Sequence, residues 1–119
     1  MKKIELTEMK LEMRDADSIS DAEQEASHKV WYNRCHLAVK EEIKNGKVKI
    51  VKKWKKGYST QNFITEEGWK VAQKAAKRIE KKYGKKNLII HSGFDWGMLN
   101  GRLETLRWIM GEDWGQLDN

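Results

Sequence analysis

The chain has 119 residues and a mass of 14.0 kDa, so we expect a single domain over 1–119. Charged residues make up 35% and hydrophobic residues 39% of it, which excludes an integral membrane protein and a fully disordered chain. Lys and Arg total 24 against 18 Asp and Glu, a formal net charge of +6. The basic start lacks the apolar stretch of a signal peptide, and a lone cysteine, Cys35, cannot form an internal disulfide. We therefore expect a cytoplasmic protein that does not contact a membrane.

The first part of the chain predicts strand structure followed by one long helix. Apolar and polar residues alternate over 3–13 with one slip in phase, which is typical of a strand with a bulge. Ser20 and Glu23 have the spacing of a capping box, so a helix is expected over about 21–44, ended by Asn45–Gly46. Two apolar stripes of this helix should face neighbouring layers: Tyr32, Cys35, Val39 and Ile43 in one, and Ala26, Val30 and Leu37 in the other.

The middle of the chain predicts a β-hairpin. Residues 47–54 and 58–64 are rich in β-branched and aromatic side chains, and Gly57 lies between them. Trp54 is in phase with the apolar residues of the first strand, so we place its ring in the core.

Two further helices are expected, one on each side of Gly84. Thr65 can cap the first, whose apolar residues recur at helical spacing as far as Gly84. Ser92 or Asp95 can cap the second, over about 95–110. The whole pattern predicts an α+β domain with three helices packed on a small antiparallel sheet that contains the hairpin.

Positive charge is concentrated in one third of the chain. Residues 47–86 carry a net charge of +11, whereas 1–46 carry −2 and 87–119 carry −3. Such a local positive potential is the usual electrostatic footprint for nucleic acid or another polyanion. Lysines neutralise phosphates, and an exposed aromatic ring can stack on a base of a single strand. The candidate contact residues lie in the hairpin and on the second helix: Lys52, Lys53, Lys55, Lys56, Tyr58, Lys70, Lys74, Lys77, Arg78 and Lys81.

The same lysines also fit a structural interpretation. Lysines on an edge strand prevent aggregation between sheets, and the acidic ends of the chain could fold against the basic middle and neutralise it. We favour binding for the lysines as a group, and a core position for Trp54.

The third helix is apolar on more than one side, which is typical of a domain centre or of a subunit interface. A narrow polar row on it, Asn100, Glu104 and Arg107, could hold a small polar ligand. Glu104 and Arg107 also have the spacing of an ordinary i,i+3 ion pair, which is the interpretation we favour. With Trp108, these residues form a second candidate site, for a ligand or a protein partner.

No motif in the chain predicts catalysis or a metal site. The three histidines and Cys35 lack the spacing of zinc ligands, and Cys35 lies on a stripe expected to be buried, where a thiol is inert. The chain has no glycine-rich phosphate loop and no nucleophile elbow. An enzyme, a cofactor and a metal ion are therefore not expected.

Two segments resemble other proteins. Phe63–Gly68, with the sequence Phe-Ile-Thr-Glu-Glu-Gly, resembles the point in winged-helix regulators where the last strand of the wing enters the next helix, and the likeness covers about 47–80. Gly97–Trp108, with the pattern Gly-Met-Leu-Asn-Gly-Arg-Leu followed by Leu-Arg-Trp, resembles the C-terminus of short uncharacterised bacterial proteins. The second resemblance implies a shared fold element and no activity.

The sequence thus predicts a small non-enzymatic nucleic-acid-binding protein that uses a basic hairpin-plus-helix face. The alternative is a protein–protein interaction module, a regulator or inhibitor, that docks or forms a homodimer through its C-terminal helix. Six tryptophans provide large rings suited to such an interface.

Overall fold

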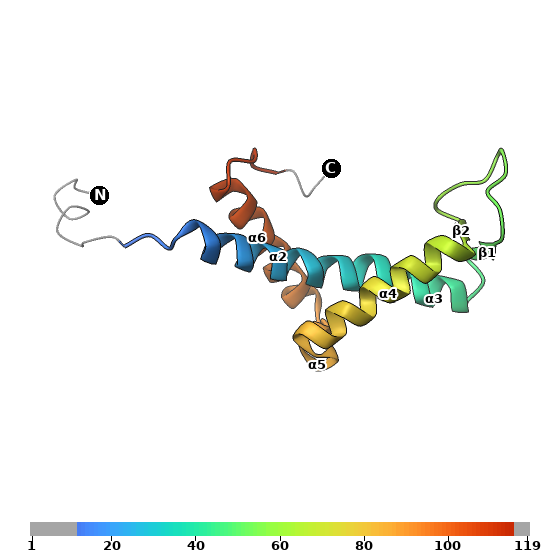
Figure 1. Cartoon of the computed structure of the whole chain (residues 1–119), viewed down its shortest axis with the longest axis horizontal. Coiled ribbons are helices and arrows are strands. Elements are labelled where there is room, and N and C mark those ends of the chain that lie inside the picture. Colours follow the sequence, from blue (N-terminus) through green and yellow to red (C-terminus); the bar gives the residue numbers. More distant parts are fainter. Residues whose placement is uncertain (1–11, 116–119) are drawn as a thin grey trace.

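A computed structural model describes residues 12–115, and its central element is one long helical rod (Figure 1). The rod has three consecutive parts: α2 (Ala16–Trp31), the π-helical segment η1 (Tyr32–Leu37) and α3 (Ala38–Lys44). The other elements follow in the order β1 (Lys49–Val51), β2 (Phe63–Thr65), α4 (Glu66–Tyr83), α5 (Lys85–Leu88) and α6 (Gly93–Ile109). Apart from its last two residues, the strand predicted over 3–13 lies outside the described residues.

The rod begins earlier than the capping box at Ser20 and Glu23 predicts. Asp15 is the N-cap residue, and its carboxylate accepts a hydrogen bond from the Ser18 N–H at 2.7 Å. This backbone hydrogen bond lowers the pKa of Asp15, because it favours the charged form. The predicted end of the rod is confirmed, since Asn45 is its C-cap and Gly46 follows with φ of 84°.

The π-helical segment η1 changes which side chains of the rod are buried. The Ala38 N–H donates to the carbonyl of Asn33, five residues earlier, so this turn holds one residue more than an α-helical turn. The extra residue turns Cys35 out to solvent and brings His36 into the interior. The prediction of a buried Cys35 is therefore wrong, because it assumed regular α-helical phase throughout.

The two strands are parallel, so the predicted antiparallel hairpin is wrong. Lys49 pairs with Phe63 and Val51 with Thr65. Parallel strands need a connection of about a dozen residues to bring the chain back, and the loop 52–62 provides it. Stacked aromatic rings lie in this loop, in place of the tight turn of a hairpin.

The rings of the loop form a short stack. Tyr58 lies on Phe63 with ring centroids 4.0 Å apart, and Trp54 meets Tyr58 edge-on at 5.6 Å. Trp54 lies beyond the end of β1, where no partner strand fixes which way its side chain points. It is 46% exposed, so its predicted core position is wrong.

The rod lies between two apolar clusters, which match its two predicted stripes only in part, because Leu37 packs with the cluster of Tyr32 and not with that of Ala26 and Val30. On one side Ala26 and Val30 pack against α6, through Leu99 and Leu103. On the other side Tyr32 packs against α4 and α5 in a cluster with three further buried residues: Ala76, Ile79 and Leu88. The architecture is therefore a mixed α+β one in which helices dominate and the sheet has only two strands.

Three boundary predictions for the later helices are confirmed. Thr65 caps α4, Gly84 ends it with φ of 84°, and Ser92 caps α6 by accepting a hydrogen bond from the Asp95 N–H at 3.1 Å. None of the helices between residues 12 and 115 combines the length and the apolar run that crossing a bilayer requires.

Candidate nucleic-acid interface

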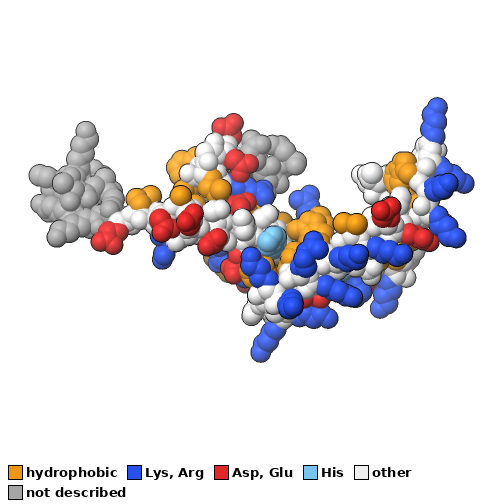
Figure 2. All heavy atoms as spheres, viewed as in Figure 1, with side chains coloured by type: hydrophobic (Ala, Val, Ile, Leu, Met, Phe, Trp, Pro, Cys, Tyr) orange, Lys and Arg blue, Asp and Glu red, His pale blue; other side chains and the backbone are white. Residues whose placement is uncertain are grey.

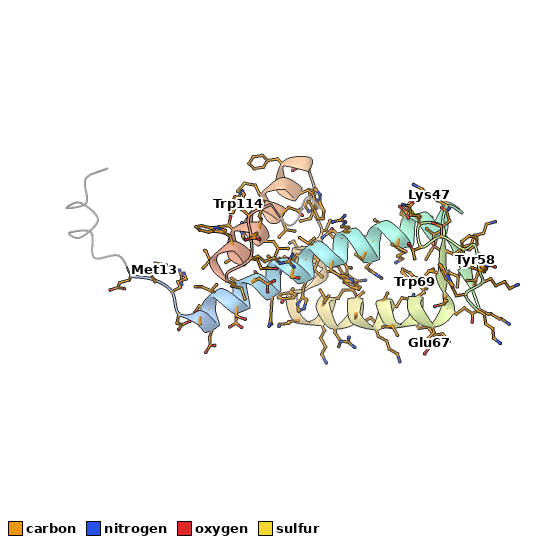
Figure 3. The ribbon with its side chains drawn as sticks, turned by 90° about the horizontal axis from the view of Figure 1, so that it is seen from above. Met13, Lys47, Tyr58, Glu67, Trp69 and Trp114 are labelled. Carbon is orange, nitrogen blue, oxygen red and sulfur yellow. The ribbon has the colours of Figure 1, made fainter. Side chains whose placement is uncertain are left out.

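The outer side of α4 presents a row of lysines. The inner side of this helix buries Trp69, Ala76 and Ile79 against the rod. In Figure 3 Trp69 points from α4 toward the rod, whereas Glu67 points away from it. At about 3.6 residues a turn, the side opposite the buried face carries Glu67 near the start of α4 and then four exposed lysines: Lys70, Lys74, Lys77 and Lys81.

Four more exposed lysines lie in the loop 52–62, just before β2 and α4: Lys52, Lys53, Lys55 and Lys56. The loop projects at the end of the molecule where α3 ends and α4 begins (Figure 1). The eight lysines of the loop and of the outer row of α4 therefore follow one arm of the molecule, and we call them the basic arm.

Charge is segregated along the molecule. In Figure 2 Lys and Arg side chains cover the arm formed by α4, α5 and the loop, whereas most Asp and Glu side chains gather over α2 and around α6. All fourteen Lys and Arg residues of 47–86 are exposed. Within residues 12–115, the ion pairs are Glu25 with Lys29 and Arg107 with Glu23 and Glu112, so none involves a cation of the arm.

Trp54 stands beside this charge and next to a cavity of about 570 Å³. The cavity lies between α3, the loop and β2, and its lining is mostly apolar, with Trp54 and Val48 beside polar groups such as Gln61. Tyr58, the aromatic residue predicted to contact nucleic acid, is only partly exposed, because Phe63 covers one face of its ring. Trp54 is thus the more accessible ring of the loop. Its place among four lysines in the sequence was the signal for an exposed position.

Arg78 lies apart from the outer row of α4. It lines a separate hollow of about 250 Å³ between α2 and α4, together with His28, Trp31 and Lys82. Lys82 lies over the ring of Tyr83 at 5.4 Å from its centroid. These cations extend the positive surface around the flank of α4 rather than along the basic arm.

A set of contacts that the sequence analysis missed fixes the orientation of α4. Buried His36 lies between Trp31 and Trp69, with ring centroids 6.4 and 5.6 Å away and planes 16° apart in both cases. Its Nδ1 has no hydrogen-bond partner among the described residues. Burial lowers the pKa of His36, an effect that Glu80 opposes.

Two hydrogen bonds extend this contact along the rod. The Tyr32 hydroxyl donates to Oε2 of Glu80 at 2.5 Å, and Nδ1 of His28 lies 3.0 Å from the Tyr83 hydroxyl. Burial, together with the bond to Glu80, raises the pKa of Tyr32 to about 12. The spacing of four residues between His28, Tyr32 and His36 was the available signal. These contacts hold the inner side of α4 against the rod and so keep its lysines outward.

The second candidate site is not assembled as a ligand site. Arg107 turns away from Glu104 and bridges α6 to α2, with Nε 3.3 Å from Oε1 of Glu23. Asn100 donates to the carbonyl of Trp96 at 2.8 Å, a bond within its own helix. Trp108 is 55% exposed. The i,i+3 ion pair favoured from the sequence is therefore absent, and the row does not converge on one point.

Among residues 12–115, no group of three His, Cys, Asp or Glu side chains lies close enough to share a metal ion. Comparisons of the chain with protein-family models, with curated proteins and with solved structures found no match. The two resemblances noted in the sequence stay predictions, and the candidate interface is argued from its geometry.

Proposed function

We propose that the protein binds nucleic acid, or another polyanion, through the basic arm and catalyses no reaction. The observation that carries this proposal is the absence of any carboxylate partner, within residues 12–115, for the exposed cations of 47–86. A positive surface without internal counter-charges attracts phosphates and raises their rate of association.

Repulsion within α4 supports the same conclusion. Lys70 and Lys74, and likewise Lys77 and Lys81, are like charges four residues apart on one helix. Each such pair destabilises a helix by a few tenths of a kcal/mol. A bound phosphate backbone would screen this repulsion, so binding would restore the helix stability that the like charges reduce in the free protein.

Trp54 favours a single strand as the ligand. Its half-exposed ring lies beside four lysines, the combination of base stacking and phosphate neutralisation that single-strand-binding proteins use. In a duplex the bases are already stacked on each other, so no base is free to stack on the ring of Trp54. We therefore propose single-stranded DNA or RNA over duplex DNA.

The test is binding of fluorescently labelled oligonucleotides, measured by anisotropy with a 20-nucleotide single strand and a 20-base-pair duplex. Alanine at Lys55, Lys56, Lys74 and Lys77 should abolish binding at moderate salt. The matched control replaces four exposed cations outside 47–86 and removes the same charge: Arg14, Arg34, Lys40 and Lys44. Equal loss in both variants would mean that only net charge matters, and equal binding by the arm variant and the wild type would refute the proposal.

A further inference from the structure

The side of α6 that faces away from the rod is apolar and largely exposed, and Trp114 from the turn after the helix packs edge-on against Trp108 there, with ring centroids 5.9 Å apart. Leu99 and Leu103 are 4% and 1% exposed, because they pack against α2. On the other side of the same helix three large side chains are more than half exposed: Phe94 at 75%, Met98 at 52% and Trp108 at 55%. Exposed apolar surface gathered on one helix face marks an interaction site.

Glycines form a groove between these side chains. Gly93, Gly97 and Gly101 are spaced four residues apart, so they lie on one face of α6. They line, with Trp114, a hollow of about 690 Å³. A Cβ atom added at any of the three would meet nothing within 4 Å. Glycine inside a helix is less stable than alanine, and nothing among the described residues requires it at these positions. The space above them fits the close approach of a backbone from another molecule.

We propose that α6 pairs antiparallel with α6 of a second copy, about a two-fold axis that passes near Gly101. Phe94 and Trp108 lie seven residues on either side of Gly101, which is about 10 Å along the helix in each direction. The two-fold axis therefore places Phe94 beside the partner's Trp108 at both ends, while glycines let the backbones approach in the middle. Antiparallel helices also oppose their macrodipoles favourably.

Charge favours a second copy of this surface as the occupant. The ionisable side chains of α6 are two carboxylates and two guanidinium groups: Asp95, Glu104, Arg102 and Arg107. Two such helices can meet without net repulsion. The basic arm cannot pair with itself in this way, because its charges are all of one sign.

The size of the surface fits a stable dimer. Phe94, Met98 and Trp108, with Trp114 at 62% exposed, offer roughly 500 Å² of apolar surface per copy. A standard interface buries about 800 Å² per partner, of which about 60% is apolar. The open face of α6 therefore provides about the apolar area that one half of such an interface contains.

Light scattering of the full chain tests the dimer. The expected mass is about 28 kDa, twice the 14.0 kDa of one chain, at both 0.1 and 1 M NaCl, because apolar contacts do not weaken with salt. Gly101→Leu fills the groove and should give a 14.0 kDa monomer with its helix content kept, since its Cβ meets nothing in the chain. Ala38→Leu, an enlargement only one carbon smaller at an exposed position of α3, should stay a dimer. A monomeric wild type, or a dimeric Gly101→Leu variant, overturns the proposal.

Disulfide cross-linking tests the antiparallel arrangement. Exposed Cys35 is first replaced by serine, because it could cross-link on its own. In that background Gly101→Cys should form a linked dimer under mild oxidation, since position 101 faces its own copy across the axis. Gly93→Cys should not, because its two copies lie about 24 Å apart. Linkage at both positions would indicate parallel helices, and linkage at neither would place the interface elsewhere, so either result overturns the arrangement. Adding Lys74→Ala and Lys77→Ala to the Cys35→Ser/Gly101→Cys chain should leave the linkage unchanged, which separates this inference from nucleic-acid binding.

Discussion

The salt dependence of single-strand binding is the most direct measure of the basic arm. Each neutralised phosphate of a single strand contributes about −0.7 to the slope of log K against log salt. If all eight lysines of the arm contact phosphates, the slope is about −5.6, and affinity falls about 2,000-fold between 50 and 200 mM salt. Replacing Lys74 and Lys77 by alanine removes two contacts from the middle of the outer row of α4. The slope of this variant should be about −4.2, and the same change in salt should lower its affinity only about 300-fold.

The assay is fluorescence anisotropy with a labelled 20-nucleotide strand at five or more salt concentrations. The matched control is Arg34→Ala/Lys40→Ala, which removes two exposed cations from η1 and α3, outside the arm. The control should have the slope of the wild type. The reasoning is refuted if the Lys74→Ala/Lys77→Ala variant keeps the wild-type slope, or if the control lowers the slope by the same amount.

Three further outcomes follow from the structure. Trp54→Ala should weaken single-strand binding by about 1–3 kcal/mol and duplex binding far less, as titrations of both oligonucleotides would show. Leu103→Ala should lower the free energy of unfolding by about 2–5 kcal/mol because Leu103 is almost fully buried, and Val71→Ala, at an exposed position of α4, should lower it far less. Urea denaturation of each variant measures this, and equal effects would contradict the packing of α6 on α2. The lowered pKa of His36 means that the unfolded chain binds more protons, so stability should be complete above the usual histidine pKa and fall as the pH drops through the folded-state pKa. His36→Phe should reduce this slope in thermal melts between pH 7 and pH 5, and an unchanged slope would assign it to other groups.

Local signals in the sequence predicted the helices well. Thr65, Ser92 and Gly84 mark helix boundaries through hydrogen bonds and backbone angles that depend on only a few neighbouring residues. The two apolar stripes of the rod were predicted only in part: Ala26 and Val30 face one cluster and Tyr32 the other, but Leu37 packs with the cluster of Tyr32. The lysine row of α4 follows from helical period alone, so its exposure could be predicted.

The errors concern structure that depends on distant partners. The direction in which β1 and β2 pair depends on how the loop between them folds and on where α4 begins. The alternation of apolar and polar residues within β1 carries no information on either. The core position predicted for Trp54 was wrong for a related reason, because β1 ends at Val51 and no partner strand fixes the direction of the Trp54 side chain. The exchange of Cys35 for His36 in the interior accompanies one π-helical turn, and His36 there stacks with two tryptophans from different helical segments. Arg107 likewise forms its ion pair with Glu23 on α2 and not with Glu104, one turn away on its own helix.

The π-helical turn determines how far α3 is rotated about the rod axis relative to α2. A π turn is an α-helix with one inserted residue, and each residue of an α-helix advances the chain by about 100° around its axis. Deleting Arg34 would restore regular winding and rotate α3, together with the loop that follows it, by a large angle relative to α2 and α6. One residue thus determines on which side of the molecule the lysine-bearing loop emerges with respect to the glycine groove. Lineages that gained or lost it would present the same two surfaces in a different mutual orientation.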